Sequence, residues 1–201
     1  MDSCIAPSVI KPLGRSFYER NTAVVGFELI GKILSFEQSG KMIQGRIVET
    51  EAYFGIQDPA SHAFRGPTPR AKVMFGTPGF SYVYFTYGNH HCFNVVTEKE
   101  SVAGAVLIRA LEPLSEIEMM KERRLTQDVR KLTNGPGKLT QAFGITREHS
   151  GRDLMAKLFC IIEGNEKETL SINVTTRIGI SRAKEMPYRF YLSTSPFVSC
   201  R

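Results

Sequence analysis

The sequence predicts an α+β fold: a single domain with a curved, largely antiparallel β-sheet, peripheral helices and a protruding β-hairpin. Predicted strands outnumber predicted helices, and the two do not alternate regularly as they would around a parallel sheet. The chain has 201 residues, of which 42% are hydrophobic, which is enough for one globular domain with a sizeable core. We therefore expect one domain over residues 1–201, with residues 1–14 as a loosely ordered N-terminal segment.

The first half of the chain begins with a short predicted helix over residues 22–30. Thr22 is its expected N-cap, and Gly31 lies just beyond its end. Residues 54–77 contain Gly, Pro and charged side chains without clear periodicity. They should form a long loop, and long ordered loops are commonly functional. Strands are predicted by alternating, β-branched and aromatic runs at about residues 32–37, 43–52, 80–87, 91–97 and 104–111.

The second half of the chain opens with a helix signature. Ser115 and Glu118 have the spacing of a capping box, which predicts a helix that runs to about residue 124. A shorter helix is expected to begin at Pro136. Further strands near residues 158–162, 172–177 and 189–193 close the chain.

Two carboxylates lie on one face of the second predicted strand, beside large apolar side chains. Side chains alternate between the two faces of a strand, which places five residues on this face: Ile43, Ile47, Glu49, Glu51 and Tyr53. An ionised carboxylate on an apolar face must be paired, hydrogen-bonded or neutralised, and such groups gather at sites of acid–base chemistry. The alternative is that this strand ends in solvent and both glutamates are simply hydrated.

A β-hairpin rich in tyrosine is predicted thirty residues further on. Tyr82 and Tyr84 lie on one face of its first strand, and Gly88-Asn89 supplies the turn. Tyr87 therefore sits at the hairpin tip, where a large ring has little to pack against within its own fold. Ordinary half-buried strand tyrosines are one interpretation. Three tyrosines in six residues beside a basic surface also suit base stacking or insertion into a duplex.

The charge of the chain favours an anionic partner. The formal net charge is +6 and the isoelectric point is near 9.2, although many basic proteins bind no nucleic acid. The basic residues are spread along the chain, which suits a folded binding surface better than a disordered tail.

The cysteines, the histidines and the apolar runs point to a cytoplasmic protein without a metal site. No C-x-x-C pair occurs among Cys4, Cys92, Cys160 and Cys200, so reduced thiols are expected. The four histidines show no ligand spacing, and we predict no metal and no cofactor. We find no signal sequence and no apolar run of membrane-spanning length, so we expect no membrane association.

Six segments then carry a resemblance in their order and spacing. They are Glu49-Thr50-Glu51-Ala52-Tyr53, Met74-Phe75 with Pro78-Gly79, Tyr82-Val83-Tyr84 with Tyr87-Gly88, Asn94, residues 107–113 (LIRALEP) and residues 134–139 (NGPGKL). Together they resemble the alkyladenine (3-methyladenine, methylpurine) DNA glycosylase family over roughly residues 15–200. Because the chain lacks the long N-terminal extension of the mammalian members, it is similar to the compact bacterial type.

The resemblance implies a monofunctional glycosylase that starts base excision repair. Such an enzyme flips alkylated or deaminated purines (3-methyladenine, 7-methylguanine, hypoxanthine or ethenoadenine) out of duplex DNA and hydrolyses the N-glycosidic bond. The implied catalytic residues are Glu51, which activates the water, and Arg109, which helps to position it. Glu49 competes for the role of base, and a backbone carbonyl of residues 177–179 is a further expected water ligand.

The resemblance also implies the residues that hold the damaged base. The expected pocket walls are Tyr53, His62 and Tyr84, whose faces favour an electron-poor or cationic purine. The amide of Asn94 is expected to reject purines with a misplaced exocyclic group. Tyr87 is the expected wedge that fills the space left in the duplex.

Double-stranded DNA with damaged purines is the expected partner, and a monomer is the expected state. Two other functions stay open at this point. A non-catalytic nucleic-acid-binding module is one, because the tRNA-binding domain of methionyl-tRNA formyltransferase is thought to share this fold type. The other is a metal-dependent nuclease or phosphatase, for which two carboxylates are too few.

Overall fold

The structure is a computed structural model that describes residues 10–86, 88, 90–164 and 169–199. Its strands are β1 (Ile33–Gln38), β2 (Lys41–Phe54), β3 (Ser81–Thr86), β4 (His90–Val96), β5 (Gly104–Pro113), β6 (Phe159–Ile162), β7 (Ile172–Thr175) and β8 (Arg189–Leu192). Its α-helices are α1 (Arg15–Tyr18), α2 (Thr22–Glu28), α3 (Ile117–Arg124) and α4 (Pro136–Phe143). The predicted α+β class is confirmed.

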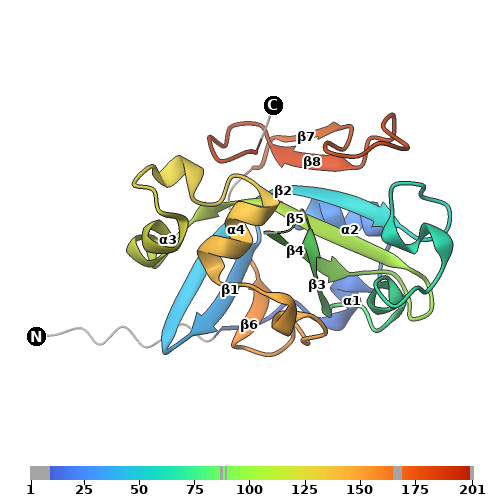
Figure 1. The fold of residues 1–201 in the computed structure, drawn as a ribbon, viewed down its shortest axis with the longest axis horizontal. Coiled ribbons are helices and arrows are strands. Elements are labelled where there is room, and N and C mark those ends of the chain that lie inside the picture. The colour runs from blue at the N-terminus through green and yellow to red at the C-terminus, as the bar shows by residue number, and fades with distance from the viewer. Residues whose placement is uncertain (1–9, 87, 89, 165–168, 200–201) are drawn as a thin grey trace, which may run out of the picture.

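One curled antiparallel sheet organises the molecule, like half of a barrel (Figure 1). The strand order is β3-β4-β5-β2-β1-β6, and β8 joins the same sheet by pairing with both β2 and β7. Each pairing between the described strands is antiparallel. The β3–β4 hairpin forms one end of this order, and its tip residues Tyr87 and Asn89 lie outside the described residues.

Strand β2 is the centre of the sheet and explains why its carboxylates are buried. Its first half pairs with β1, its second half pairs with β8, and β5 runs along its other edge. Residues 47–52 are consequently all buried, so the predicted alternation between a core face and a solvent face stops there. The register against β5 shifts on both sides of Glu49, which leaves Val48 and Arg109 without a partner across the ladder.

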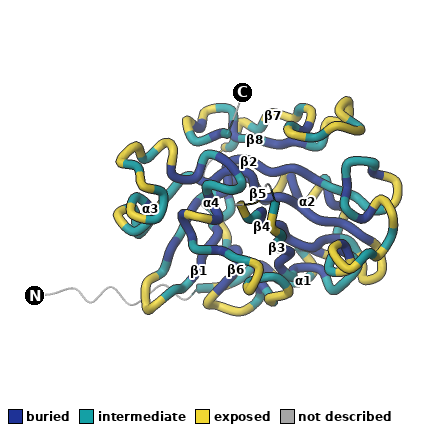
Figure 2. Tube along the Cα trace, in the orientation of Figure 1, coloured by how far each residue is buried: buried dark blue, intermediate teal, exposed yellow. Residues whose placement is uncertain are grey.

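The core forms on both sides of the sheet. Helix α2 packs against β2, β5 and β8, and α4 packs against β4 and β5. In Figure 1, α4 lies in front of the sheet and α2 behind it. The Thr50 hydroxyl donates to the carbonyl of Gly26 at 2.7 Å, which ties β2 to α2. Figure 2 shows the resulting gradient, with buried residues along the central strands and exposed residues in the peripheral loops.

The predicted cap of the first helix is wrong by one residue. Asn21 is the N-cap of α2, and its side chain accepts from the N–H groups of Ala23 and Val24. The Thr22 hydroxyl instead contacts the Thr97 hydroxyl at 2.9 Å and donates to Glu98 at 2.7 Å. Thr22 is therefore used to fasten α2 to the chain after β4, and the helix ends at Glu28, two residues earlier than expected.

The predicted capping box of α3 is also wrong. The Ser115 hydroxyl donates to the carbonyl of Met42 at 2.6 Å and accepts from the N–H of Gln44 at 2.9 Å. It thus binds the edge of β2, and the cap position is taken by Glu116 in a left-handed conformation. Glu118 is exposed and pairs with Lys121.

The long loop over residues 54–77 contains structure that the sequence pattern did not show. Two 3-10 turns, His62–Arg65 and Lys72–Phe75, shape it. The helix α1 and the 3-10 turns Val129–Lys131 and Arg147–His149 were likewise not predicted. All are four residues or shorter, too short for a periodic signal. Near the N-terminus, Pro12 pairs with Ile162 and Leu13 is buried.

The role of Ser115 leads to a stability prediction. Ser115→Ala removes two hydrogen bonds at the edge of β2 and should lower the free energy of unfolding by about 1–2 kcal/mol. Glu118→Ala should leave it unchanged within error, because an exposed i,i+3 pair contributes little. Urea unfolding of the two variants measures both effects. A larger loss of unfolding free energy in Glu118→Ala than in Ser115→Ala would support the capping box instead.

Candidate active site

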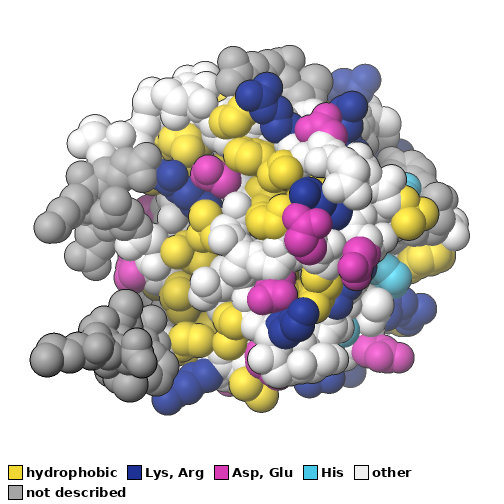
Figure 3. Space-filling view, turned by 90° about the vertical axis from the view of Figure 1, so that its left-hand side faces the viewer, with side chains coloured by type: hydrophobic (Ala, Val, Ile, Leu, Met, Phe, Trp, Pro, Cys, Tyr) yellow, Lys and Arg dark blue, Asp and Glu magenta, His cyan; other side chains and the backbone are white. Residues whose placement is uncertain are grey.

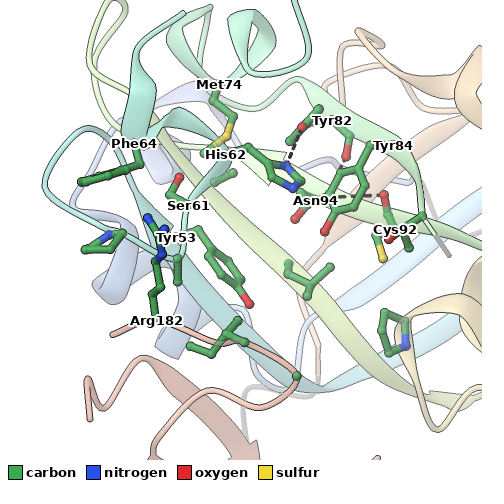
Figure 4. Close-up of a pocket in the computed structure, with 18 of the residues that line it drawn as sticks. Tyr53, Ser61, His62, Phe64, Met74, Tyr82, Tyr84, Cys92, Asn94 and Arg182 are labelled. Carbon is green, nitrogen blue, oxygen red and sulfur yellow. Dashed lines mark hydrogen bonds between the residues drawn. The ribbon is translucent and has the colours of Figure 1, made fainter. Parts of the chain in front are cut away.

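A pocket of about 540 Å³ opens beside the centre of the sheet. Its walls come from the end of β2, the loop after it, strands β3, β4 and β5, the start of α4 and residues 178–182 (Figure 4). Five of the residues predicted from the sequence line it: Tyr53, His62, Tyr84, Asn94 and Arg109. The predicted wedge, Tyr87, lies outside the described residues.

The register of the sheet explains why these side chains converge. A row of laterally paired residues crosses four strands, from β3 to β2, in the order Tyr82, Asn94, Leu107 and Glu51. Paired residues in neighbouring strands point to the same face. Residues more than thirty positions apart in sequence are thereby placed on a single wall.

Glu51 lies directly behind the pocket and is fully buried. Its Oε2 accepts from the Tyr53 hydroxyl at 2.7 Å and from Nη1 of Arg109 at 3.2 Å. Its Oε1 accepts from the backbone N–H of Ile178 at 2.8 Å. The predicted segment at residues 177–179 therefore reaches Glu51, although the group that contacts the carboxylate is an N–H.

Burial dominates the acidity of Glu51 and raises its pKa above the ordinary value. The Arg109 guanidinium, the Ile178 N–H and the Tyr53 hydroxyl each lower it, and the nearby Glu49 raises it further. The net shift is upward. Such a carboxylate is a stronger base when it is ionised, and a base is most effective when its pKa lies closer to the working pH.

Glu49, the competing carboxylate, accepts four hydrogen bonds. Its Oε1 accepts from Nε of Arg189 at 2.8 Å, from Nε of Arg109 at 3.2 Å and from the hydroxyl of Ser199 at 3.0 Å. The N–H of Ser199 donates to Oε2 at 2.7 Å. Neither glutamate lines the pocket, but the three donors to Glu51 all do, whereas among the donors to Glu49 only Arg109 does. The other contacts of Glu49 attach the C-terminal segment to β2, which favours a structural role.

Arg109 bridges the two carboxylates from the register shift in β5. Burial lowers the pKa of Arg109, but Glu51 and Glu49 outweigh this effect and raise it overall. The guanidinium is therefore cationic, and it is the positive group that directly neighbours both glutamates.

An aromatic cluster forms the opposite wall. The rings of His62 and Tyr84 meet edge to face with centroids 4.6 Å apart, and Tyr84 is tilted against Tyr82 at 5.3 Å. Nδ1 of His62 lies 2.9 Å from the Tyr82 hydroxyl, and Figure 4 shows the imidazole beside Tyr84 with a hydrogen bond to Tyr82. Burial, with help from Arg70, lowers the pKa of His62 to about 4. His62 is therefore neutral near pH 7.

Asn94 is held rigidly by the strand that carries it. Its amide nitrogen donates to the carbonyl of Tyr82 at 3.0 Å and to that of Cys92 at 3.4 Å. The side chain is buried. Because the backbone occupies the amide N–H groups, the amide oxygen remains for a group in the pocket.

Sequence reasoning missed three residues of the site. The sequence indicates Cys92 only as a free thiol, although it lines the pocket; Tyr82, which belongs to the predicted tyrosine cluster, lines it as well. Asp58 and Arg177 form a buried ion pair behind Tyr53, with Nη1 to Oδ2 at 2.6 Å. The alternation of β4, which places Cys92 on the same face as Asn94, could have indicated Cys92. No local pattern links the last two.

The described residues contain no group of three or more His, Cys, Asp or Glu side chains that could hold a metal ion. None of the helices in the described ranges is long and apolar enough to cross a membrane.

Comparisons with known proteins all point to one family. The sequence matches the family model described as "Methylpurine-DNA glycosylase" over residues 16–196. A protein of Chlorobium luteolum named "Putative 3-methyladenine DNA glycosylase" is 49% identical over 188 residues, which cover 93% of this chain and 96% of that protein. Proteins with the same name from Chlorobaculum tepidum and Desulfitobacterium hafniense are 47% and 46% identical, over 94% and 96% of this chain and 91% and 100% of their own lengths.

The environment of His62 gives a direct test of the pocket. Burial disfavours the charged imidazolium, so His62 should stay neutral as the pH falls from 8 to 5 and take up a proton only near pH 4. The chemical shifts of the His62 ring, assigned by comparison with His62→Gln, report this titration by NMR. A midpoint at the ordinary histidine value would mean that the ring lies in water and not in a closed aromatic wall.

Proposed function

The chain belongs to the methylpurine-DNA glycosylase family, and we propose that it is a monofunctional glycosylase that flips damaged purines from duplex DNA and hydrolyses their N-glycosidic bond. The proposed substrates are 3-methyladenine, 7-methylguanine, hypoxanthine and ethenoadenine. Membership makes the protein a base-excision-repair hydrolase of N-glycosyl bonds. The observation that carries the mechanism is the buried Glu51, which is hydrogen-bonded to Arg109 and Ile178 at the back of an aromatic pocket.

The pocket suits a planar and electron-poor base. A purine inside a duplex is out of reach of any side chain, so the nucleotide must leave the stack before it can react. Tyr53, His62 and Tyr84 supply flat walls for the extruded base. Aromatic faces attract cationic rings more than neutral ones, which favours alkylated purines over normal purines. The amide of Asn94 is the proposed gate against a misplaced exocyclic group.

Glu51 Oε1 is the proposed acceptor of the proton. Oε2 already accepts two hydrogen bonds, whereas Oε1 accepts one from Ile178 and has capacity for another donor. A water beside Oε1 loses its proton to Glu51 as its oxygen attacks the sugar C1′. The C1′–N bond breaks, and its electron pair leaves with the base. The positive charge on the sugar is stabilised by the carboxylate.

The leaving base receives little help from the protein. His62 is neutral near pH 7 because its pKa is about 4, so it is a poor proton donor there. A cationic base such as 7-methylguanine leaves as a neutral molecule and needs no proton. Neutral lesions such as hypoxanthine require a proton from solvent, and we expect them to react more slowly.

The DNA itself is proposed to cross the mouth of the pocket. Arg65 and Arg182 are exposed and line that mouth, where phosphates beside a flipped nucleotide would pass. On the face in Figure 3, Lys and Arg side chains are interspersed with acidic and apolar ones, without one continuous basic patch. Tyr87 remains the proposed wedge. We further propose a cofactor-free monomer that works in the cytoplasm on DNA.

A non-catalytic binding module explains the geometry less well. Burying a carboxylate costs several kcal/mol unless it is paired, and such a module has no use for Glu51 behind an aromatic pocket. The free-energy cost of burying Glu51 is explained if the carboxylate takes part in the reaction.

Replacement of Glu51 tests the mechanism. Glu51→Gln keeps the shape of the side chain and removes the base, so excision should fall by about three to four powers of ten while binding to lesion-containing duplex survives. Release of methylpurines from DNA treated with dimethyl sulfate, in single turnover, measures the rate. Glu49→Gln should cost stability more than rate. Wild-type turnover in Glu51→Gln, together with its loss in Glu49→Gln, would reverse the assignment.

The nature of the nucleophile gives a second test. A lyase requires an amine that forms a Schiff base with the sugar, and no lysine lines the described part of the pocket. The product should therefore be an intact abasic strand that breaks only on later alkali treatment, and borohydride should trap no covalent adduct. Activity should persist in EDTA. A stoichiometric adduct would show a lyase, and loss of activity in EDTA that a divalent ion restores would favour the nuclease alternative.

A further inference from the structure

Arg177 and Asp58 form a bidentate ion pair behind the pocket wall. Nη1 of Arg177 lies 2.6 Å from Oδ2 of Asp58, and Nη2 lies 2.8 Å from Oδ1. Nη1 also donates to the carbonyl of Ala52 at 3.0 Å. The guanidinium is stacked over the ring of Tyr53 at 4.7 Å and near that of Tyr188 at 5.5 Å. Both charged side chains are almost completely excluded from solvent.

This pair joins three segments that build the site. Asp58 belongs to the loop that leads to His62, and its carboxylate also accepts from the N–H groups of Phe54 and Ala60. Ala52 and Tyr53 belong to the end of β2, next to Glu51. Arg177 precedes Ile178, whose N–H lies on Glu51. The Arg177 guanidinium thus links three parts of the site: the segment that contacts Glu51, the Tyr53 ring, and the loop that carries His62 on the opposite wall.

Stability alone does not account for such a pair. A buried ion pair often contributes less than apolar side chains of similar volume, because desolvation offsets the attraction. Nε of Arg177 is also buried without a hydrogen-bond partner among the described residues, which adds a further cost. Burying this ion pair therefore costs free energy of folding, and its evident effect is to fix the positions of the groups around it.

The position that matters most is that of the Ile178 amide. On its C-terminal side, Gly179 has a φ of +73° and the chain then becomes exposed at Ser181 and Arg182. On its N-terminal side stands Arg177, which is fixed by four polar and aromatic partners. Arg177 is therefore the anchor that sets where this N–H points.

We propose that Arg177 is a positioning residue of the excision reaction, which holds the Ile178 N–H on the proton-accepting oxygen of Glu51 and the Tyr53 ring against the flipped base. This inference rests on the proposed glycosylase function and adds a residue to it. Asp58 locks the guanidinium in place. Glu51 and the Tyr53 wall are thereby aligned with each other. A purine that stacks correctly on Tyr53 then places the C1′ atom of its sugar next to the water on Glu51.

The sign of the pH effect follows from the groups around Glu51. Arg109 from β5 and the Tyr53 hydroxyl from β2 stabilise the carboxylate, and Glu49 from β2 opposes it. The positive charge of Arg177 also favours the ionised form, and Arg177→Lys keeps that charge. Cys92 from β4 is a further titratable neighbour, with its own pKa raised by burial. The Ile178 N–H is the group that Arg177 controls, and it favours the ionised form. Its loss raises the pKa of Glu51, so activity is lost at a higher pH as the solution is acidified.

Arg177→Lys tests the proposal, because lysine keeps the charge beside Asp58 but cannot form the fork or the stack. We expect the acid limb of the single-turnover rate on methylated DNA to move up by about one pH unit. The rate should fall by up to ten-fold at pH 6 and less at pH 8, with duplex binding unchanged. The matched control is Arg15→Lys. Arg15 similarly joins a carboxylate, Asp153, to a backbone carbonyl, that of Pro78, and does not line the pocket.

Two further measurements keep the test decisive. The pKa of Glu51 can be followed by NMR of its carboxyl carbon in wild type and Arg177→Lys, and this readout is independent of any activity. If Arg177→Lys folds poorly, Asp58→Asn keeps the charge of Arg177 and weakens the fork that holds it, and should move the Glu51 titration in the same direction. An unchanged Glu51 titration in a folded variant, or a rate lowered equally at every pH, overturns the proposal. A wild-type enzyme that releases no methylpurine refutes the glycosylase function instead.

Discussion

The burial of two carboxylates on one strand is the constraint on which the rest of the structure depends. Glu49 and Glu51 are both inaccessible to solvent at the centre of the sheet, and neither can be ionised there without donors. Arg109 supplies a shared positive charge from the neighbouring strand. The Tyr53 hydroxyl donates from β2 itself, and the other donors, Ile178, Arg189 and Ser199, come from the last part of the chain. These contacts to buried carboxylates help to hold the C-terminal segment against β2.

The two carboxylates divide their roles through their surroundings and not through their chemistry. Glu49 accepts four hydrogen bonds, and apart from Arg109 its donors lie away from the pocket. Glu51 accepts three and lies directly behind the pocket wall, with one oxygen able to accept another donor. Identical side chains two residues apart thus become an attachment point and a candidate base, as expected when environment sets function.

The sequence predicted those parts of the fold that depend on local pattern. The strands follow from alternating runs along the chain, and the α+β class follows from the order of strands and helices. The placement of Glu51 and Tyr53 on one face follows from alternation within β2. The caps at Thr22 and Ser115 failed because both hydroxyls found partners far along the chain, at distances of 75 and 73 residues. The pair between Asp58 and Arg177 spans 119 residues, and no spacing rule reaches that far. Local chemistry proposes a contact, and tertiary packing decides which contact forms.

The pocket, as we interpret it, selects lesions twice by independent means. Aromatic walls favour a cationic or electron-poor ring when the base enters. The bond-breaking step then discriminates again, because His62 is neutral near pH 7 and supplies no proton to the departing base. A normal adenine would have to leave as an anion, whereas a methylated purine that carries positive charge leaves as a neutral molecule. Since each proton-transfer contribution is worth about 10²–10⁴ in rate, the lack of a general acid in the proposed mechanism would cost little for cationic lesions and would protect undamaged DNA. The same reasoning explains why the hydrogen-bond donors of the site converge on Glu51. A cationic lesion needs an activated water and no proton donor.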